Sequence, residues 1–238
     1  MKNITPFVSV VGIGQMGLGI AKNIQNAGYL NSIFEINESL LSKFKRSENL
    51  IINDAKKGLK SSNVLIFVVP STTQIKDFLF GSNWIDHINE NTIIVDLTTS
   101  NPDETKKLSN ELSVRKINYI DCGMTGGAQG AENGTLTLMM GGDKSIMDSV
   151  TPVLDTFTNR LIHVGSIGSG HALKLIHNMV THTIFLATVE GVISAKKLGI
   201  DPKIVIDVFN SGNARSYISQ SRFPNHILSE KWDARSRV

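Results

Sequence analysis

The sequence lacks the features that mark several specialised classes of protein. Its one cysteine, Cys122, cannot form an internal disulfide, which favours a reducing compartment over a secreted disulfide scaffold. No apolar run approaches the roughly 18 residues of a membrane span, and the N-terminus has no signal-peptide pattern. The basic residues form no block of the kind that binds a phosphate backbone. We therefore expect a cytoplasmic protein that binds neither a membrane nor nucleic acid.

The composition that remains is that of an ordinary globular protein. The chain has 238 residues, of which 41% are hydrophobic and 19% charged, with a formal net charge of +3. A chain of this length can bury one large core or two modest ones. No metal site is predicted, because four of the histidines follow no spacing typical of metal ligands: His87, His163, His182 and His226.

The first informative pattern is a strand, a glycine turn and a helix. Phe7 to Val11 is an apolar run typical of a strand buried on both faces, and it leads into Gly12-Ile13-Gly14-Gln15-Met16-Gly17. In this context Gly12 permits the tight turn, Gly14 lets the backbone approach a pyrophosphate, and Gly17 lets the helix lie close to the sheet. The unpaired N–H groups at the start of the helix then face the phosphates. We expect a dinucleotide at this turn.

A carboxylate follows at the end of the second expected strand, Ser32 to Ile36. Glu35 lies about twenty residues beyond the glycines, where a carboxylate can bind both hydroxyls of an adenosine ribose and would repel a 2′-phosphate. No arginine follows immediately. We therefore expect NAD as the cofactor in preference to NADP, although a carboxylate at a strand end can also be merely solvated.

Two later strands end in polar turns. Val64 to Val69 is followed by Pro70, and Thr92 to Asp96 is followed by a turn that contains Thr99. Ligands bind at the carboxyl ends of the strands in an open parallel sheet, so both turns should line the cofactor cleft. Contact of Thr99 with the cofactor and a role of Thr99 in the turn or as a helix cap are equally consistent with the sequence. Pro102 begins the next helix, and Ser100 or Asn101 is its expected cap.

A glycine-rich segment follows the strand that ends at Asp121. The hydroxyl of Thr125 and the backbone N–H groups at Gly126 and Gly127 are suited to binding a carboxylate. The alternative is a wide loop before the next strand, from Thr135 to Met140.

The longest helical pattern begins in the stretch from Ser166 to Asn178. His171, Lys174 and Asn178 recur at a spacing that places them on one side of a helix. Lys174 lies among apolar residues, so it either keeps its ammonium group in water or takes part in chemistry. His171 either forms a hydrogen bond near the cleft or lies in the core.

These patterns predict an α/β fold with two domains. Residues 1–165 should form a Rossmann-type, doubly wound and mainly parallel sheet that binds NAD, and residues 166–238 an all-α substrate and dimerisation domain. The second domain should contain a long helix over about 168–199, a further helix that starts at Asp201-Pro202, and a polar tail from Ser229. Because the long helix has apolar residues on several faces, we expect a homo-oligomer, either a dimer or a tetramer.

Four motifs, in this order, together resemble the β-hydroxyacid dehydrogenase family. They cover residues 12–23, 96–102, 121–137 and 168–178. The resemblance implies that Lys174 is the catalytic lysine, that Asn178 helps to place the substrate, and that Thr125-Gly126-Gly127 binds the substrate carboxylate. It also implies that three residues touch the cofactor: Val69, Pro70 and Thr99. The implied activity is hydride transfer between NAD and a small hydroxy acid or its semialdehyde, similar to 3-hydroxyisobutyrate.

The chain departs from the family pattern at three positions and in its length. Gly123 stands where proline is usual, Thr125 where serine is commoner, and His177 where asparagine is frequent, which bears on the shape of the substrate pocket. Members of the family usually continue through further helices, so we expect the C-terminal domain to be incomplete.

Three other functions remain open. An oxidative decarboxylase similar to 6-phosphogluconate dehydrogenase would need a cationic phosphate site, for which Arg215 and Arg222 are the candidates. An imine reductase shares the architecture but commonly carries another residue at the position of Lys174. The third is a protein that binds NAD without catalysis.

Overall fold

The computed structural model describes residues 6–42, 44 and 50–231, and the chain forms two compact units, Met1–Leu175 and Ile176–Val238. The units divide within a long helix, whereas the domains expected from the sequence divide near residue 165. That domain division therefore stays a prediction. Most of the polar tail, residues 232–238, lies outside the described residues.

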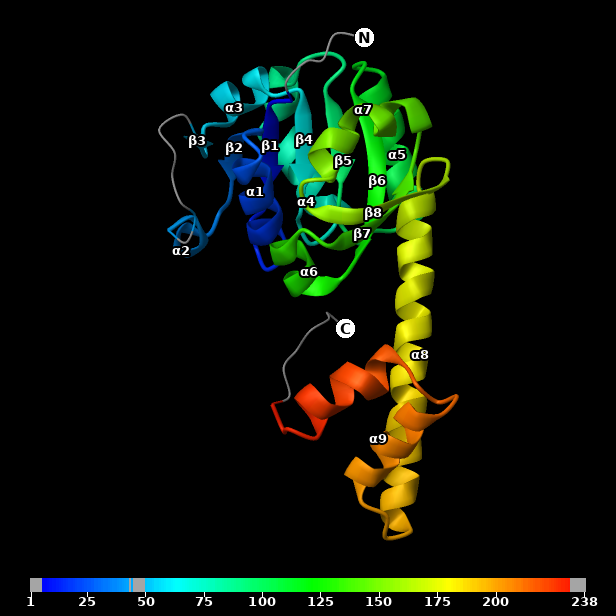
Figure 1. The fold of residues 1–238 in the computed structure, drawn as a ribbon. Helices are drawn as coiled ribbons and strands as arrows, with labels where there is room; N and C mark the ends of the chain where they lie inside the picture. The colour runs from blue at the N-terminus through cyan, green and yellow to red at the C-terminus, as the bar shows by residue number, and fades with distance from the viewer. Residues whose placement is uncertain (1–5, 43, 45–49, 232–238) are drawn as a thin grey trace. The chain divides into compact units, whose positions relative to one another are not determined.

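The first unit is built on one eight-stranded sheet (Figure 1) with the strand order β3-β2-β1-β4-β5-β6-β7-β8. The pairs among β1 to β6 are parallel, β7 is antiparallel to β6, and β8 is parallel to β7. This confirms the mainly parallel, Rossmann-type sheet. The strands are β1 (Val8–Val11), β2 (Leu30–Phe34), β3 (Ile51–Ile52), β4 (Val64–Phe67), β5 (Ile93–Asp96), β6 (Asn118–Thr125), β7 (Leu136–Gly141) and β8 (Thr158–Gly165).

Helices connect these strands and continue into the second unit. In the first unit they are α1 (Gly17–Asn26), α2 (Glu38–Leu41), α3 (Ala55–Ser61), α4 (Thr72–Lys76), α5 (Pro102–Ser113), α6 (Gly127–Asn133) and α7 (Lys144–Leu154), with the short helices η1 (Asp77–Gly81) and η2 (Trp84–His87). The long helix α8 spans Ser169–Lys197, and it is followed by α9 (Pro202–Ser211) and a π-helical segment, η3 (Ile218–Ile227).

Side chains point alternately to the two faces of the sheet, and each face is covered by its own apolar core. Val64 and Ile66 of β4 pack in the core that includes the buried residues of α1 and α7. Leu65 and Phe67 pack in the other core, with the buried residues of α3 and α5. Successive side chains of a strand point to opposite faces, so a continuous apolar run is what a strand covered on both faces requires.

The helix starts follow local capping chemistry. The side chain of Asn101 accepts a hydrogen bond from the backbone N–H of Asp103 at 2.8 Å, and Pro102 occupies the first turn of α5. Asp201 caps α9 in the same way, with its carboxylate 2.8 Å from the backbone nitrogen of Lys203. A side chain at this position satisfies a backbone donor that the helix leaves unpaired. The predicted cap on α5 is thus confirmed for Asn101.

The glycine-rich segment differs from the wide loop that was one of its two interpretations. Strand β6 continues past Asp121 to Thr125 because β7 pairs with it along this length, from Asp121 opposite Gly141 to Thr125 opposite Thr137. The short helix α6 follows directly. Antiparallel pairing with β7 satisfies backbone groups that a loop would leave to solvent, so Thr125 ends a strand.

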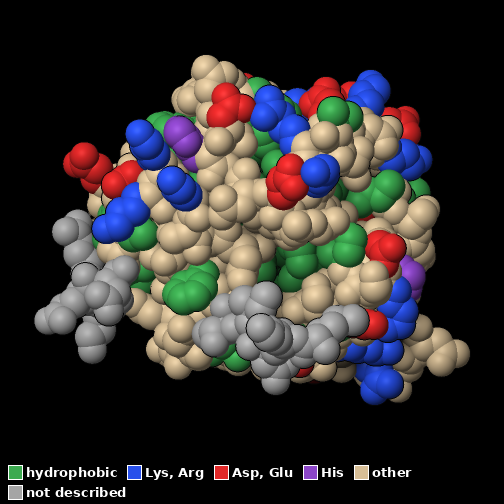
Figure 2. Space-filling view, turned by 90° about the horizontal axis from the view of Figure 1, so that it is seen from above, with side chains coloured by type: hydrophobic (Ala, Val, Ile, Leu, Met, Phe, Trp, Pro, Cys, Tyr) green, Lys and Arg blue, Asp and Glu red, His purple; other side chains and the backbone are tan. Residues whose placement is uncertain are grey.

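The second unit packs around its own small apolar cluster, which joins α8, α9 and η3 through Val192, Val205, Ile206, Ile218 and Phe223. Other apolar residues of α8 in this unit remain exposed: Ile176, Met179, Val180, Ile184, Leu186 and Ile193. No helix in the described part of the chain is long and apolar enough to cross a membrane. Acidic and basic side chains both occur on the surface seen in Figure 2.

Truncation of a core residue of α5 should destabilise the first unit strongly. Leu108 is fully buried, so Leu108→Ala should lower the free energy of unfolding by roughly 2–5 kcal/mol, through lost apolar burial and a cavity. Urea denaturation followed by circular dichroism measures this change. The matched control is Val114→Ala at the end of the same helix, where the side chain is 85% exposed and the expected change is within about 0.5 kcal/mol. Equal effects at the two positions would contradict the core assignment.

Candidate functional site

The glycine turn after β1 has room for a ligand at one glycine and for no side chain at the other two. Gly12 has φ +89°, and a Cβ atom there would lie 2.5 Å from the carbonyl oxygen of Val68. A Cβ on Gly17 would lie 2.0 Å from the carbonyl oxygen of Gly12. Around Gly14, in contrast, a Cβ would meet nothing within 4 Å. The turn thus presents open backbone at Gly14, as the approach of a pyrophosphate requires.

The other residues of the turn occupy distinct environments. Ile13 is fully buried, Gln15 is exposed, and Met16 is half-buried at the residue before α1. Met16 is not adjacent to Gly14 in the chain, and none of its atoms lies within 4 Å of a Cβ placed on Gly14.

Glu35 is tied to the glycine turn. One carboxylate oxygen accepts a hydrogen bond from the backbone N–H of Ile13 at 2.8 Å, and the other accepts from the N–H of Asn37 at 2.9 Å. Asn53 pairs with the backbone N–H and C=O of Glu35, each at 2.9 Å. A carboxylate oxygen has more than one acceptor position, so both oxygens can still accept from a hydroxyl group. The side chain is oriented in advance beside the turn.

The remaining predicted cofactor residues follow β4 and β5 at the same edge of the sheet. β2, β1, β4 and β5 are adjacent and parallel, so their carboxyl ends lie together. Val69 lies against the turn, since its Cγ1 atom would be 3.1 Å from a Cβ on Gly12. Pro70 and Thr99 are exposed after β4 and β5, respectively. Thr99 does not cap α5, because Asn101 does.

The predicted carboxylate-binding segment lies between β6 and α6. Thr125 is half-buried at the end of β6, and Gly126 and Gly127 are exposed with φ values of +122° and +66°. Glycine adopts such values without steric cost, and the backbone N–H groups here are not covered by side chains of their own residues.

Helix α1, which follows the glycine turn, packs directly on α6. The side-chain amide of Asn23 donates to the carbonyl oxygens of Ala131 and Glu132 at 2.9 and 3.2 Å. A Cβ on Gly19 would lie 2.7 Å from the backbone of Ala131. The glycine turn and the Thr125-Gly126-Gly127 segment are therefore joined through two packed helices, a link that the sequence did not predict.

Lys174 lies in the part of α8 that belongs to the first unit and is half-buried. Burial lowers the pKa of its amino group from the ordinary value of lysine. Its Cβ atom packs against Gly123 of β6, where an added Cβ would lie only 2.6 Å away. Asn178 follows one helical turn later, is half-buried, and belongs to the second unit. The environment of Lys174 is thus more enclosed than that of an ordinary solvated lysine.

A buried polar network that the sequence did not predict supports the start of α8. Asp121 is fully buried, and its two oxygens accept from the backbone N–H groups of Gly168 at 2.7 Å and His171 at 2.8 Å. The ring of His171 is also fully buried, with Nδ1 2.8 Å from the hydroxyl of Thr105. His171 is therefore a core histidine and not a cleft residue.

The network continues to the neighbouring strand. Asp96 of β5 stands opposite Asp121 in the sheet register, and its carboxylate lies 3.8 Å from Nε2 of His171. The hydroxyl of Tyr119 donates to Asp96. Burial, together with the charge of Asp96, raises the pKa of Tyr119 well above its usual value, which keeps this donor protonated. In the sequence, Asp96 and Asp121 stood out only as aspartates at the ends of two expected apolar strands. Their hydrogen-bond partners include residues from distant segments of the chain.

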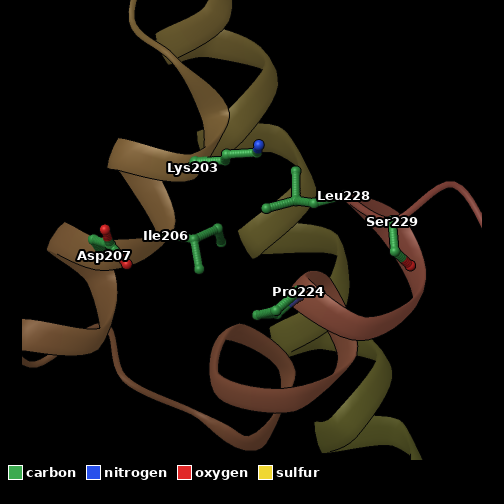
Figure 3. A pocket seen from close by; sticks show the side chains of 6 residues that line it. All are labelled: Lys203, Ile206, Asp207, Pro224, Leu228 and Ser229. Atoms are coloured by element: carbon green, nitrogen blue, oxygen red, sulfur yellow. The ribbon is translucent and has the colours of Figure 1, made fainter.

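Two hollows lie away from the predicted site residues. The first, of about 380 Å³, is in the second unit and is lined by side chains of α9 and of the segment around η3 (Figure 3): Lys203, Ile206, Asp207, Pro224, Leu228 and Ser229. The second, of about 420 Å³, lies in the first unit beside Ser109, Tyr119 and Ile167. Neither contains a predicted site residue, so the glycine turn and its neighbours remain the candidate site. Within the described residues, no cluster of three or more His, Cys, Asp or Glu side chains is arranged to hold a metal ion.

Comparison with known families agrees with this geometry. Residues 7–165 match the family described as the NAD binding domain of 6-phosphogluconate dehydrogenase. Residues 168–238 match the family described as NAD-binding of NADP-dependent 3-hydroxyisobutyrate dehydrogenase.

Individual relatives agree with these matches, and a solved structure shares the fold. The mitochondrial 3-hydroxyisobutyrate dehydrogenase of Drosophila melanogaster is 29% identical over 213 residues, which cover 90% of this chain and 65% of the relative. The 2-hydroxy-3-oxopropionate reductase of Escherichia coli is 29% identical over 212 residues, or 87% of this chain and 71% of the relative. The structure of Mycobacterium tuberculosis 3-hydroxyisobutyrate dehydrogenase with L-serine superposes with a TM-score of 0.84 at 22% identity, over 94% of this chain and 76% of that one.

The chain thus spans about two thirds of the length of the Drosophila protein. The family match covers residues 7–165 of the predicted dinucleotide domain, including the glycine turn, the strand ends that follow it and the Thr125-Gly126-Gly127 segment. On this evidence, the chain belongs to the β-hydroxyacid dehydrogenase family.

Proposed function

We propose that the protein transfers a hydride between NAD and a small β-hydroxy acid or its semialdehyde, with Lys174 as the proton donor and acceptor. The observation that carries the proposal is the environment of Lys174: a half-buried amine on α8, packed against the strand that ends at Thr125. Burial lowers the pKa of Lys174, so its neutral amine is available at a lower pH than that of an ordinary lysine, which favours proton exchange with a substrate hydroxyl. The names of the relatives support a hydroxy acid as the substrate class.

The residues of the glycine turn fit a nicotinamide dinucleotide. The backbone at Gly14 faces open space where a pyrophosphate can approach, and Glu35 is oriented beside the turn to accept hydrogen bonds from ribose hydroxyls. Val69, Pro70 and Thr99 follow strands that end at the same edge and would contact the cofactor. A nicotinamide cofactor bound there would supply the acceptor for the substrate hydride in oxidation and the hydride donor in reduction.

The roles of the protein groups follow from their chemistry. The hydroxyl of Thr125 and the N–H groups at Gly126 and Gly127 hold the substrate carboxylate. In oxidation the neutral amine of Lys174 takes the proton of the substrate hydroxyl, and in reduction the ammonium form returns a proton to the carbonyl oxygen. Asn178, one turn further along α8, orients the hydroxyl or the amine.

Loss of the lysine should abolish most turnover without loss of cofactor. Lys174→Ala should lower kcat by roughly a hundredfold or more, the usual scale for acid-base catalysis. The Kd for NADH, measured by fluorescence titration, should stay unchanged. Lys196→Ala, in the last turn of the same helix, is the control and should keep the parent rate. A Lys174→Ala variant with parent turnover would show that another group moves the proton.

The lowered pKa of Lys174 predicts opposite pH dependence in the two directions. Oxidation requires the neutral amine, so its kcat should rise with pH through an apparent pKa below the ordinary lysine value of about 10.4. Reduction requires the ammonium form, so its kcat should fall with increasing pH through the pKa of the same group. Steady-state rates across pH in each direction test this. Profiles with the same slope in both directions would contradict a single shared group.

The preference for NAD rests on Glu35. The parent should have a higher kcat/KM with NAD than with NADP, because the carboxylate repels a 2′-phosphate. Glu35→Gln removes the charge and should reduce that ratio by roughly tenfold, the scale of one charged hydrogen bond. Glu38→Gln, on the exposed start of α2, is the charge-matched control. If the parent instead prefers NADP, the interpretation of Glu35 is wrong while the hydride-transfer proposal stands.

We also propose that the protein forms a homo-oligomer. The exposed apolar residues of α8 in the second unit support this, since large contiguous apolar surface is uncommon on monomers. Light scattering coupled to size-exclusion chromatography should give a mass of at least two chains. A monomer at all concentrations tested would refute the proposal.

A further inference from the structure

We propose that strand β6 sets the position of Lys174, with Asp121 and Gly123 as positioning residues that fix its place relative to Thr125. This inference rests on the proposed function, because it assigns these two residues a purpose in presenting the lysine. Neither residue is placed in contact with substrate or cofactor.

Alternate residues of β6 face the start of α8. Tyr119 of β6 packs in the core that includes the buried residues of α5. Asp121, Gly123 and Thr125 follow it at intervals of two and therefore share its face of the sheet. Along this face the strand first binds the start of α8 through Asp121, then touches Lys174 at Gly123, and ends at Thr125. A strand advances about 3.4 Å per residue, so Thr125 lies about 7 Å beyond the point where Lys174 makes contact.

The attachment at Asp121 leaves little freedom to the helix start. Both of its buried oxygens are engaged by backbone N–H groups, of Gly168 and His171, which lie on either side of the first residues of α8. The helix also packs closely at Gly170, where a Cβ would lie 2.4 Å from the carbonyl oxygen of Met139 and 2.6 Å from that of Asp121. At Gly141 of β7, a Cβ would lie 2.4 Å from the Asp121 carboxylate. The first turn of α8 is thus held against β6 and β7 by close contact as well as by hydrogen bonds.

Gly123 decides how near Lys174 comes to the strand. A Cβ at this position would lie 2.6 Å from Cβ of Lys174 and 2.7 Å from the carbonyl oxygen of Gly170. The first atom cannot turn away by a rotamer change, and the second belongs to the helix backbone. Any side chain at residue 123 must therefore displace the helix turn that carries the lysine.

The first test adds a side chain at Gly123. Gly123→Ala should lower kcat by roughly tenfold to a hundredfold, since a shift of about 1 Å in a catalytic group can cost this much. The KM for the hydroxy acid and the Kd for NADH should change by less than about threefold, because their proposed binding groups are untouched. The control is Gly58→Ala in α3, where a Cβ would also be crowded, 2.7 Å from the hydroxyl oxygen of Ser32. That variant should lose thermal stability but keep kcat.

The second test changes the Asp121 carboxylate, which accepts the hydrogen bonds from the start of α8. One of its readouts does not depend on turnover. In Asp121→Asn an amide group stands where one carboxylate oxygen accepted an N–H, so one backbone donor at the helix start loses its acceptor. Hydrogen exchange of the Gly168 or His171 amide, followed by NMR, should become roughly tenfold faster, and kcat should fall with KM retained. Asp143→Asn is the control, because Asp143 caps α7 by accepting from Ser145 at 2.7 Å and α7 carries no proposed site residue.

The outcomes separate this inference from the proposed function. Parent kcat in both Gly123→Ala and Asp121→Asn, together with an inactive Lys174→Ala variant, would overturn the positioning role and leave the catalytic lysine in place. Parent turnover in Lys174→Ala would overturn the proposed function. In that case faster exchange in Asp121→Asn would still establish the attachment of α8, and unchanged exchange would refute that as well.

Discussion

The start of α8 depends on one buried carboxylate. A helix leaves its first backbone N–H groups without partners inside the helix, and burial of such groups without acceptors is costly. Here Asp121 accepts from two of them, at Gly168 and His171, at a place closed to solvent. The acceptor belongs to an interior strand of the sheet. The start of the helix is therefore hydrogen-bonded to a fixed position on β6 and not merely packed on it. Because Lys174 lies on the same helix, its position relative to β6 follows from these two hydrogen bonds.

The sheet supplies the second constraint. Parallel pairing places the carboxyl ends of β2, β1, β4 and β5 at one edge, and this brings together residues that are far apart in the sequence. The hydrogen bond from Ile13 to Glu35 is the clearest example, because it joins the glycine turn to the end of the next strand. A second connection, from Asn23 to the end of α6, links the same turn to the glycine segment after β6. The proposed cofactor residues and the proposed carboxylate-binding segment are therefore held in a single packed unit.

The two buried aspartates show why this support is polar. Asp96 and Asp121 stand opposite each other in register, where two carboxylates without partners would be very unfavourable. Each instead has donors: Tyr119 and the backbone N–H of Thr98 for Asp96, and the start of α8 for Asp121. The ring of His171 lies between Asp96 and Thr105, with Nε2 3.8 Å from the carboxylate and Nδ1 2.8 Å from the hydroxyl. Buried polar groups of this kind are tolerated only when nearly all are satisfied, which restricts how α5, α8 and the sheet can be arranged.

Much of the architecture could be predicted from the sequence because its signals are local. The apolar run before Gly12, the helical spacing after Gly17 and the cap at Asn101 each depend on residues within one or two turns of chain. The interval from Gly12 to Glu35 belongs to a single βαβ unit. The end of β6 could not be predicted in this way, because the extension from Asp121 to Thr125 exists only through its pairing with β7. For the same reason the glycine-rich segment read equally well as a loop.

The sequence by itself determined most of the strands and the long helix, the glycine turn, and the lysine that lies among apolar residues on a helix. Tertiary structure alone decided that His171 is a core residue, that Asp121 holds the helix start, and that Gly123 leaves the space in which Lys174 packs. The ring of His171 contacts Thr105 of α5 and Asp96 of β5. The other two features are contacts between β6 and a helix that starts more than forty residues later in the chain. Periodicity and turn chemistry report what a segment does with its own neighbours, whereas acceptors and steric space are provided by segments that only the folded chain brings together.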